Sequence, residues 1–210
     1  MTAQASIPGE RDHPSLALVN SRHNSRRGVI DHLPSREALG EWLAWRSLVA
    51  HGDRAAARHR GGDTTDADLD AALALRDATR ELLVAAVEGR SPAPSALAAI
   101  NDAAAIAPAA HQLRWDVAGR PVRTRSAPAA TDVQRALAAI AEDAIALVCD
   151  HREDLIACEA PGCVRLLLKD HPRRHWCSTR CGDRVRAARH YRRSRESAGP
   201  TSRRSVDGPA

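Results

Sequence analysis

Bulky aromatic residues and lysine are nearly absent from this sequence. Its 210 residues include no phenylalanine, one tyrosine, four tryptophans and a single lysine, Lys169. Alanine and leucine therefore supply most of the 43% hydrophobic content. Such a composition favours helices, because strands prefer β-branched and aromatic side chains. We expect a mainly α-helical protein.

Long apolar runs are also missing. No stretch approaches the roughly 18–20 uncharged residues that a membrane-spanning helix needs. A signal peptide has a basic segment followed by an apolar one, and the N-terminus shows no such pattern. We therefore expect a cytoplasmic protein with no membrane partner. In that compartment, clustered cysteines bind metals more often than they form disulfides.

Common catalytic motifs are absent too. The sequence contains no Gly-x-x-x-x-Gly-Lys phosphate loop, no Gly-x-Ser-x-Gly nucleophile turn and no His-Glu-x-x-His zinc-protease motif. We expect that the protein is not an enzyme.

Positive charge is concentrated near the C-terminus. The whole chain has a formal net charge of +5, but residues 164–195 hold eleven basic residues against two aspartates, a net charge of +9. Residues 196–210 are neutral in sum, so the first 163 residues carry a net charge of −4. An acidic body joined to a strongly basic module indicates that the module binds a polyanion.

Apolar periodicity and capping residues predict the elements of the body. They favour helices over residues 35–49, 65–88, 95–107 and 131–149. Thr131 and Gln134 form a capping-box pattern at the start of the last helix. Residues 111–125 predict a small β-hairpin. Leu16–Asn20 is either a strand or the first turn of a helix, and Ser21–Asp31 fits no regular element.

Four of the five cysteines have the spacing of zinc ligands. Two close pairs, Cys158-x4-Cys163 and Cys177-x3-Cys181, flank thirteen residues that can double back between them. This arrangement predicts one structural Zn²⁺ bound by all four sulfurs. The four-sulfur set makes His171 and His175 unnecessary as ligands. The fifth cysteine, Cys149, is expected to be a small core residue.

The finger's own elements follow from this spacing. Residues 164–168 predict one strand of a β-hairpin, 174–176 its return strand, and 178–193 a helix that donates the last two ligands. Trp176 is expected to pack in the small core. A hairpin followed by a ligand-bearing helix describes a treble-clef-like zinc finger. The predicted parts are a disordered leader (1–14), a helical domain with a small β-hairpin (15–150), the zinc finger (153–195) and a disordered tail (196–210).

The finger carries the arginines that we expect to contact nucleic acid. A guanidinium group can bind phosphate through two hydrogen bonds and can reach guanine edges in a major groove. The candidate contacts are Arg173, Arg174, Arg184, Arg186, Arg189, Arg192 and Arg193. DNA is the expected partner, RNA is not excluded, and the alternative from another class is an adaptor whose finger docks on a protein.

The finger resembles a known family. The segment Arg174-His175-Trp176-Cys177-Ser178, followed by Cys181-Gly182-Asp183-Arg184, is similar to the CGNR zinc finger of bacterial transcription regulators. His175 replaces a motif arginine and Asp183 replaces the motif asparagine. Residues 14–150 resemble the helical ABATE domain that precedes this finger. The resemblance implies a DNA-binding, stress-linked regulator.

The helical domain offers one ligand-binding hypothesis. Asn20, His23 and Arg26 cluster in the segment with no clear structure, and Arg114 is a candidate neighbour. Together they suit a small anionic effector; the alternative is a polar surface loop. A homodimer is also a hypothesis, because DNA-binding proteins often match a two-fold operator.

Overall fold

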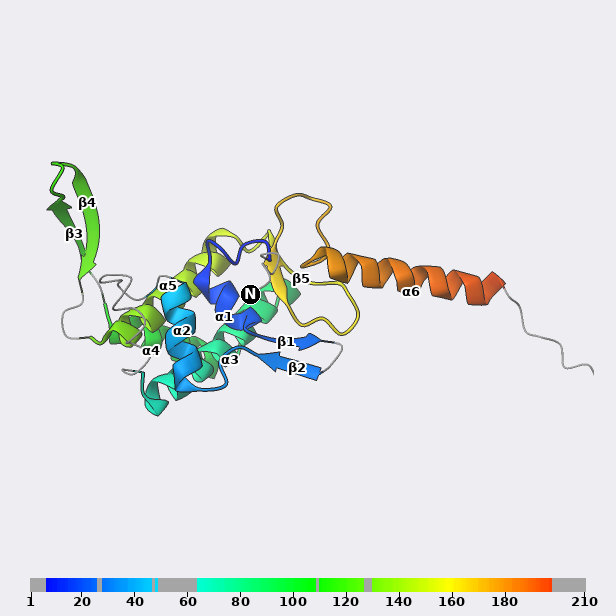
Figure 1. Cartoon of the computed structure of the whole chain (residues 1–210), viewed down its shortest axis with the longest axis horizontal. Coiled ribbons are helices and arrows are strands. Elements are labelled where there is room, and N and C mark those ends of the chain that lie inside the picture. Colours follow the sequence, from blue (N-terminus) through cyan, green and yellow to red (C-terminus); the bar gives the residue numbers. More distant parts are fainter. Residues whose placement is uncertain are drawn as a thin grey trace, which may run out of the picture.

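The computed structural model describes residues 7–25, 28–46, 48, 64–108, 110–126 and 130–197 (Figure 1). The helices of this part are α1 (Pro14–Asn20), α2 (Arg36–Trp45), α3 (Asp66–Glu88), α4 (Pro94–Ile106), α5 (Asp132–Asp150) and α6 (Thr179–Ser197). The strands pair antiparallel, β1 (Arg22–Ser25) with β2 (Gly28–Asp31), β3 (Ala110–Trp115) with β4 (Pro121–Ser126), and β5 (Leu155–Ala157) with β6 (Leu166–Leu168). The mainly α-helical fold is confirmed. None of the described helices is long and apolar enough to cross a membrane.

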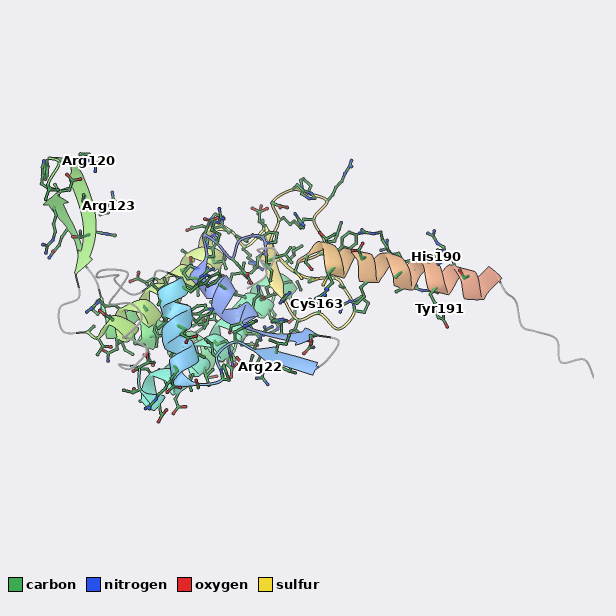
Figure 2. All side chains as sticks on the ribbon, in the orientation of Figure 1. Arg22, Arg120, Arg123, Cys163, His190 and Tyr191 are labelled. Carbon is green, nitrogen blue, oxygen red and sulfur yellow. The ribbon has the colours of Figure 1, made fainter. Side chains whose placement is uncertain are left out.

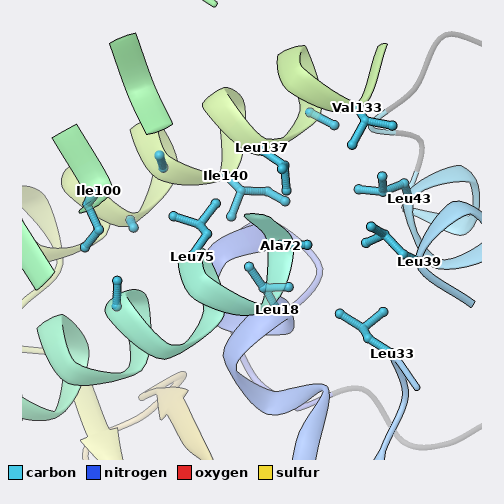
Figure 3. Close-up of a cluster of buried hydrophobic side chains, with 14 of the residues drawn as sticks. Leu18, Leu33, Leu39, Leu43, Ala72, Leu75, Ile100, Val133, Leu137 and Ile140 are labelled. Atoms are coloured by element: carbon cyan, nitrogen blue, oxygen red, sulfur yellow. The ribbon is translucent and has the colours of Figure 1, made fainter. Parts of the chain in front are cut away.

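Helices α3, α4 and α5 pack together around the main hydrophobic core (Figure 3). Leu75 of α3, Ile100 of α4 and Ile140 of α5 are almost fully buried there, and α2 adds Leu39 and Leu43. Leucine and alanine fill most of this core. The packing therefore agrees with the helical composition of the sequence.

Two core helices begin where the sequence predicts. Helix α3 starts after Thr65, whose hydroxyl accepts from the Asp68 N–H (3.1 Å) while the Asp68 carboxylate accepts from the Thr65 N–H (2.9 Å). It ends at Gly89, whose φ of +69° is a left-handed conformation that glycine adopts without strain. Helix α5 starts with the same reciprocal arrangement of Thr131 and Gln134. These capping patterns define the ends of the core helices.

The apolar segment Leu16–Asn20 belongs to helix α1. Pro14 begins the helix, where a missing N–H leaves no helical bond unmade. The Asp143 carboxylate of α5 accepts hydrogen bonds from the Ser15 N–H (2.9 Å) and from its hydroxyl. Residues 15–20 are all buried. A helix buried on every side has no polar face, which explains why the sequence left strand and helix open.

The unassigned segment Ser21–Asp31 contains the β1–β2 hairpin. Arg76 of α3 is buried and donates to both carboxylate oxygens of Asp31 (2.7 and 2.9 Å) and to the Ser21 hydroxyl (3.2 Å). These partners lie 45 and 55 positions from Arg76 in the sequence. The hairpin is held by distant polar contacts, so it shows no apolar alternation in the sequence.

The expected pairing of the finger strand and the expected burial of Cys149 were wrong. Strand β6 pairs with β5, which precedes Cys158, and not with residues 174–176. The segment before the first ligand is the better partner because Leu155 supplies a buried side chain against the body. Cys149 is exposed rather than in the core, since α5 turns Ala144 and Leu147 inward and Cys149 lies on the other side of the helix.

Candidate metal centre and nucleic-acid interface

The four cysteines reach one point from two ends of the finger. Cys158 directly follows β5, and a tight turn at Gly162 (φ +70°) brings Cys163 back towards it. Cys177 lies just before α6, and Cys181 sits in the first turn of that helix. The connection between β5 and β6 thus supplies one pair of sulfurs, and the start of α6 supplies the other.

The sulfur positions fit a tetrahedral zinc ion. Zn–S bonds of about 2.3 Å separate the sulfurs of such a site by roughly 3.8 Å. The Sγ atom of Cys163 lies 3.8 Å from that of Cys177 and 3.9 Å from that of Cys181, and Cys177 and Cys181 are 3.5 Å apart. All four sulfurs lie within 4.8 Å of one another, far beyond the roughly 2.0 Å of a disulfide. The structure therefore provides the four sulfurs that one structural zinc ion requires.

Packed this closely, the sulfurs cannot all carry charge without a cation. Hydrogen bonds from the Cys158 and Cys177 thiols lower the pKa of Cys163 to about 3. The same kind of hydrogen bond, together with burial, raises the pKa of Cys177 far above its usual value. These hydrogen bonds thus favour the thiolate of Cys163 and the thiol of Cys177. A bound zinc ion would supply the positive charge that lets all four ionise.

The residues around the sulfurs explain the motif that follows Cys181. Arg184 donates from Nη2 to the Cys181 sulfur (3.6 Å), which places a positive charge beside the thiolates. Gly182 packs closely here, because a Cβ at this position would lie only 3.1 Å from the Trp176 ring. Trp176 packs against the finger core, as expected. Arg184 is consequently turned towards the metal centre rather than towards a partner.

The finger is fused to the helical domain. Asn20, at the end of α1, donates to the Leu166 carbonyl (2.8 Å) and accepts from the Leu166 N–H (3.0 Å), so its amide pairs with β6 as a neighbouring strand would. Arg80 of α3 donates to the carbonyls of Val164 (2.8 Å) and Val19 (2.9 Å). Figure 1 shows the strands of the finger beside α1. The finger is therefore not a separately tethered module.

The start of the described chain completes the finger core. Ile7 is buried with Cys158, Leu167 and Cys177, and the Pro8 carbonyl accepts from the Leu168 N–H (3.1 Å). A leader disordered as far as residue 14 was expected here. The structure differs because the finger alone has too little apolar surface and buries Ile7 to enlarge its core.

Helix α6 carries most of the predicted nucleic-acid contacts. Cys181 and Val185 anchor its first turns, and beyond them it extends away from the body (Figure 1). Its side chains from residue 186 to 194 are all exposed, including His190 and Tyr191 (Figure 2). The exposed candidates are Arg173 before the helix and Arg186, Arg189, Arg192 and Arg193 on it.

Three candidate arginines have partners of their own. Arg174 binds both carboxylate oxygens of Asp170 (2.9 and 2.7 Å), which raises the pKa of Arg174 and lowers that of Asp170. Arg186 donates to Asp183 (2.6 Å) and lies over the Trp176 ring. Arg184 points to Cys181. Arg189 and Arg192 differ from these three, because within the described residues no ion pair holds either of them.

Of the effector cluster expected from the sequence, the described residues bring together only Asn20 and His23. The Asn20 amide binds β6, and the His23 ring is buried within 3.3 Å of the Asn20 carbonyl. Arg114 lies on β3, in the hairpin at the far end of the molecule (Figure 1). Arg26 lies outside the described residues. Arg76 and Arg80, which the sequence analysis did not select, contact this region through Ser21 and the Val19 carbonyl.

Fold and site together define a zinc-finger protein whose helical domain precedes and supports the finger. A family model named ABATE, described as "Putative stress-induced transcription regulator", matches residues 12–151, and a model of the CGNR zinc finger matches residues 155–194. The first match covers more than half of the chain, so the protein belongs to the ABATE family and carries a CGNR zinc finger. A search among curated proteins finds no match. The family resemblance and the structural zinc predicted from the sequence are confirmed.

Proposed function

We propose that this protein regulates transcription by binding duplex DNA through helix α6. The observation that carries the proposal is a 19-residue helix that leaves the body with Arg186, Arg189, Arg192 and Arg193 exposed. An α-helix fits the major groove of B-form DNA, and guanidinium groups bind both phosphates and guanine edges there. Membership of a family described as transcription regulators supports the regulatory role.

The zinc centre has a positioning role in this proposal. It fixes Cys181 and Val185 against the strands, so the first turns of α6 are rigid and the exposed turns are presented at a defined angle. Four sulfurs complete a tetrahedral zinc site and leave no position for a reactive water. We therefore propose a structural ion and a protein without catalytic activity. The sensing and dimerisation roles of the helical domain remain predictions.

Fluorescence anisotropy with a random-sequence DNA duplex tests the proposal. The variant Arg189→Gln/Arg192→Gln removes two exposed positive charges. If each contacts a phosphate, the slope of log affinity against log salt should fall by about 1.8. The matched control, Arg36→Gln/Arg90→Gln, removes two arginines that are paired with carboxylates on the body and should leave the slope unchanged.

Other outcomes separate the rival functions. Wild-type protein with verified zinc that fails to bind DNA at low salt would favour the protein-docking adaptor. Tighter binding to structured or single-stranded RNA than to duplex DNA would favour an RNA-binding finger. Equal slopes for wild type and the α6 variant would contradict the assignment of this helix.

A further inference from the structure

A second basic element projects from the other end of the molecule. Strands β3 and β4 form an antiparallel hairpin with Ala110 opposite Ser126 and Trp115 opposite Pro121. Apart from pairing with each other, neither strand packs extensively against any of the described elements. In Figure 1 the hairpin and α6 lie at opposite ends of the long axis.

The tip of the hairpin is well defined. Asp116 accepts from the N–H groups of Ala118 (2.9 Å) and Arg120 (2.8 Å), and from Nε of Arg120 (3.0 Å). Gly119 takes the left-handed conformation (φ +72°) that the turn requires. The turn thus fixes the register of a ribbon that is otherwise free on both faces.

The exposed side chains of the ribbon combine apolar and basic groups. Leu113 and Trp115 are 67% and 62% exposed, although aromatic residues are scarce in this protein. Cross-strand partners share a face, so Arg123 lies beside Leu113, and Arg114 lies beside Val122 on the other face. Figure 2 shows Arg120 at the tip and Arg123 on β4. A two-stranded hairpin of this kind is marginally stable alone, so a partner that covers it would stabilise it.

The charge indicates which partner this is. Residues 110–126 contain four arginines against one carboxylate, Asp116, which is occupied in the turn. Because each face carries an arginine among its apolar residues, neither offers the charge-depleted centre of a protein–protein interface. A two-stranded ribbon fits the major groove of B-form DNA, and DNA-bending proteins combine arginines with apolar wedges in the minor groove. The major groove of A-form RNA is too deep and narrow for such a ribbon.

We propose that the β3–β4 hairpin is a second DNA-binding element, in which Arg114 and Arg123 contact phosphates and Trp115 packs against the groove. This inference deepens the proposed function and rests on it for the kind of partner. Since the hairpin and α6 lie at opposite ends of the molecule, they contact separate stretches of duplex. The protein would bind a segment of DNA that is longer than a single finger can cover, or would bend the duplex between its two contacts.

The experiment compares three variants of the full-length, zinc-loaded protein with one control variant. Arg114→Gln/Arg123→Gln removes two charges from the ribbon and keeps Arg120, which closes the turn. Its affinity for a duplex of about 30 base pairs should fall by up to roughly 30-fold near 0.15 M salt, and its salt slope by about 1.8. Arg189→Gln/Arg192→Gln is measured in parallel, with Arg36→Gln/Arg90→Gln as the control for charge. A third variant, Trp115→Thr, keeps strand preference and should weaken binding with little change in slope.

The pattern of losses tests the two DNA-binding elements separately. Loss only in the hairpin variant would support the hairpin and contradict α6; loss only in the α6 variant would overturn the hairpin proposal and leave the proposed function intact. Unchanged DNA binding together with a smaller mass by light scattering would assign the hairpin to a second copy of this chain instead. If the wild type binds no DNA at all, both proposals fail. Circular dichroism of every variant confirms that it is folded.

Discussion

The inner and outer halves of the zinc finger differ in how they are held. Strands β5 and β6 share buried contacts with α1 and α3, through Leu155, Leu166 and Leu16. Helix α6 is anchored only as far as Val185, and its remaining side chains described here are exposed. The difference separates two roles within one module. Substitutions in the inner half should change stability, and substitutions on the outer helix should change binding.

Loss of a zinc ligand should have the largest effect, and it should extend beyond the finger. Structural zinc contributes an apparent 10–16 kcal/mol in zinc-finger peptides, roughly the folding free energy of a small module. In Cys177→Ser we expect zinc loss and unfolding of β5, β6 and the start of α6. Because Ile7 and Leu16 pack against those strands, the helical domain should also melt at a lower temperature.

Zinc content and amide exchange measure the loss of the finger in Cys177→Ser, and a thermal melt measures the stability of its helical domain. Cys149→Ser is the matched control, since Cys149 is exposed on α5 and lies outside the sulfur cluster. A melting temperature of the helical domain equal to that of the wild type would show that the finger is an independent module after all.

The next largest effect should come from Asn20. In Asn20→Ala, the N–H and carbonyl of Leu166 lose their partner while they remain buried. A buried polar group without a partner costs about 1–3 kcal/mol, so the two together should lower the unfolding free energy by about 2–4 kcal/mol. Urea denaturation measures the change.

Asn24 provides the control for this contact. It also donates to a carbonyl of the finger, that of Gly162 (3.2 Å), but it does so at the surface. Asn24→Ala should cost less than about 1 kcal/mol. Equal losses in the two variants would mean that the Asn20 amide is no more important than an exposed hydrogen bond.

The contrast between Asn20 and the cysteines also shows what the sequence could predict. The cysteine pairs are four and five positions apart, so a local pattern reveals the metal site and the start of α6. The caps of α3 and α5 are equally local. Asn20 reaches Leu166 across 146 positions, and Arg80 reaches Val164 across 84. No spacing in the sequence records such contacts.

The same reasoning explains the errors at the finger strands and the effector cluster. The sequence showed one apolar strand, 164–168, but its true partner β5 is only three residues long and was not recognised. Arg114 was grouped with Asn20 on chemistry alone, and chemistry does not place a residue in space. The exposed Trp115 and its arginines were visible as a hairpin, whereas their isolation from the body emerged only from the fold.

Arg184 should have a moderate effect that is specific to the metal. Its guanidinium donates to the Cys181 sulfur, and partners of this kind typically change metal affinity by 10- to 100-fold. We expect Arg184→Gln to lower zinc affinity by about tenfold, measured by competition with a chromogenic chelator. Arg186→Gln is the control, because Arg186 pairs with Asp183 at the surface. A larger loss of zinc affinity in Arg186→Gln than in Arg184→Gln would contradict the role assigned to Arg184.

The smallest effect should be a change in the pH dependence of stability at the junction between the hairpin β1–β2 and the finger. Burial lowers the pKa of His23 to about 4, and the charge of Arg165 and the stacked His32 act in the same direction. The unfolded chain takes up this proton near pH 6.5, so between pH 6.5 and pH 4 it binds a proton that the folded protein excludes. The free energy of unfolding should therefore decrease as the pH falls through this window, by at most about 1.4 kcal/mol per pH unit from this group.

His23→Gln cannot titrate and should flatten that slope, whatever its effect at pH 7, while the other titrating groups are common to both proteins. Urea denaturation between pH 7 and pH 5 gives the two slopes. Parallel slopes would mean that His23 is protonated in the folded protein and that the junction opens to water.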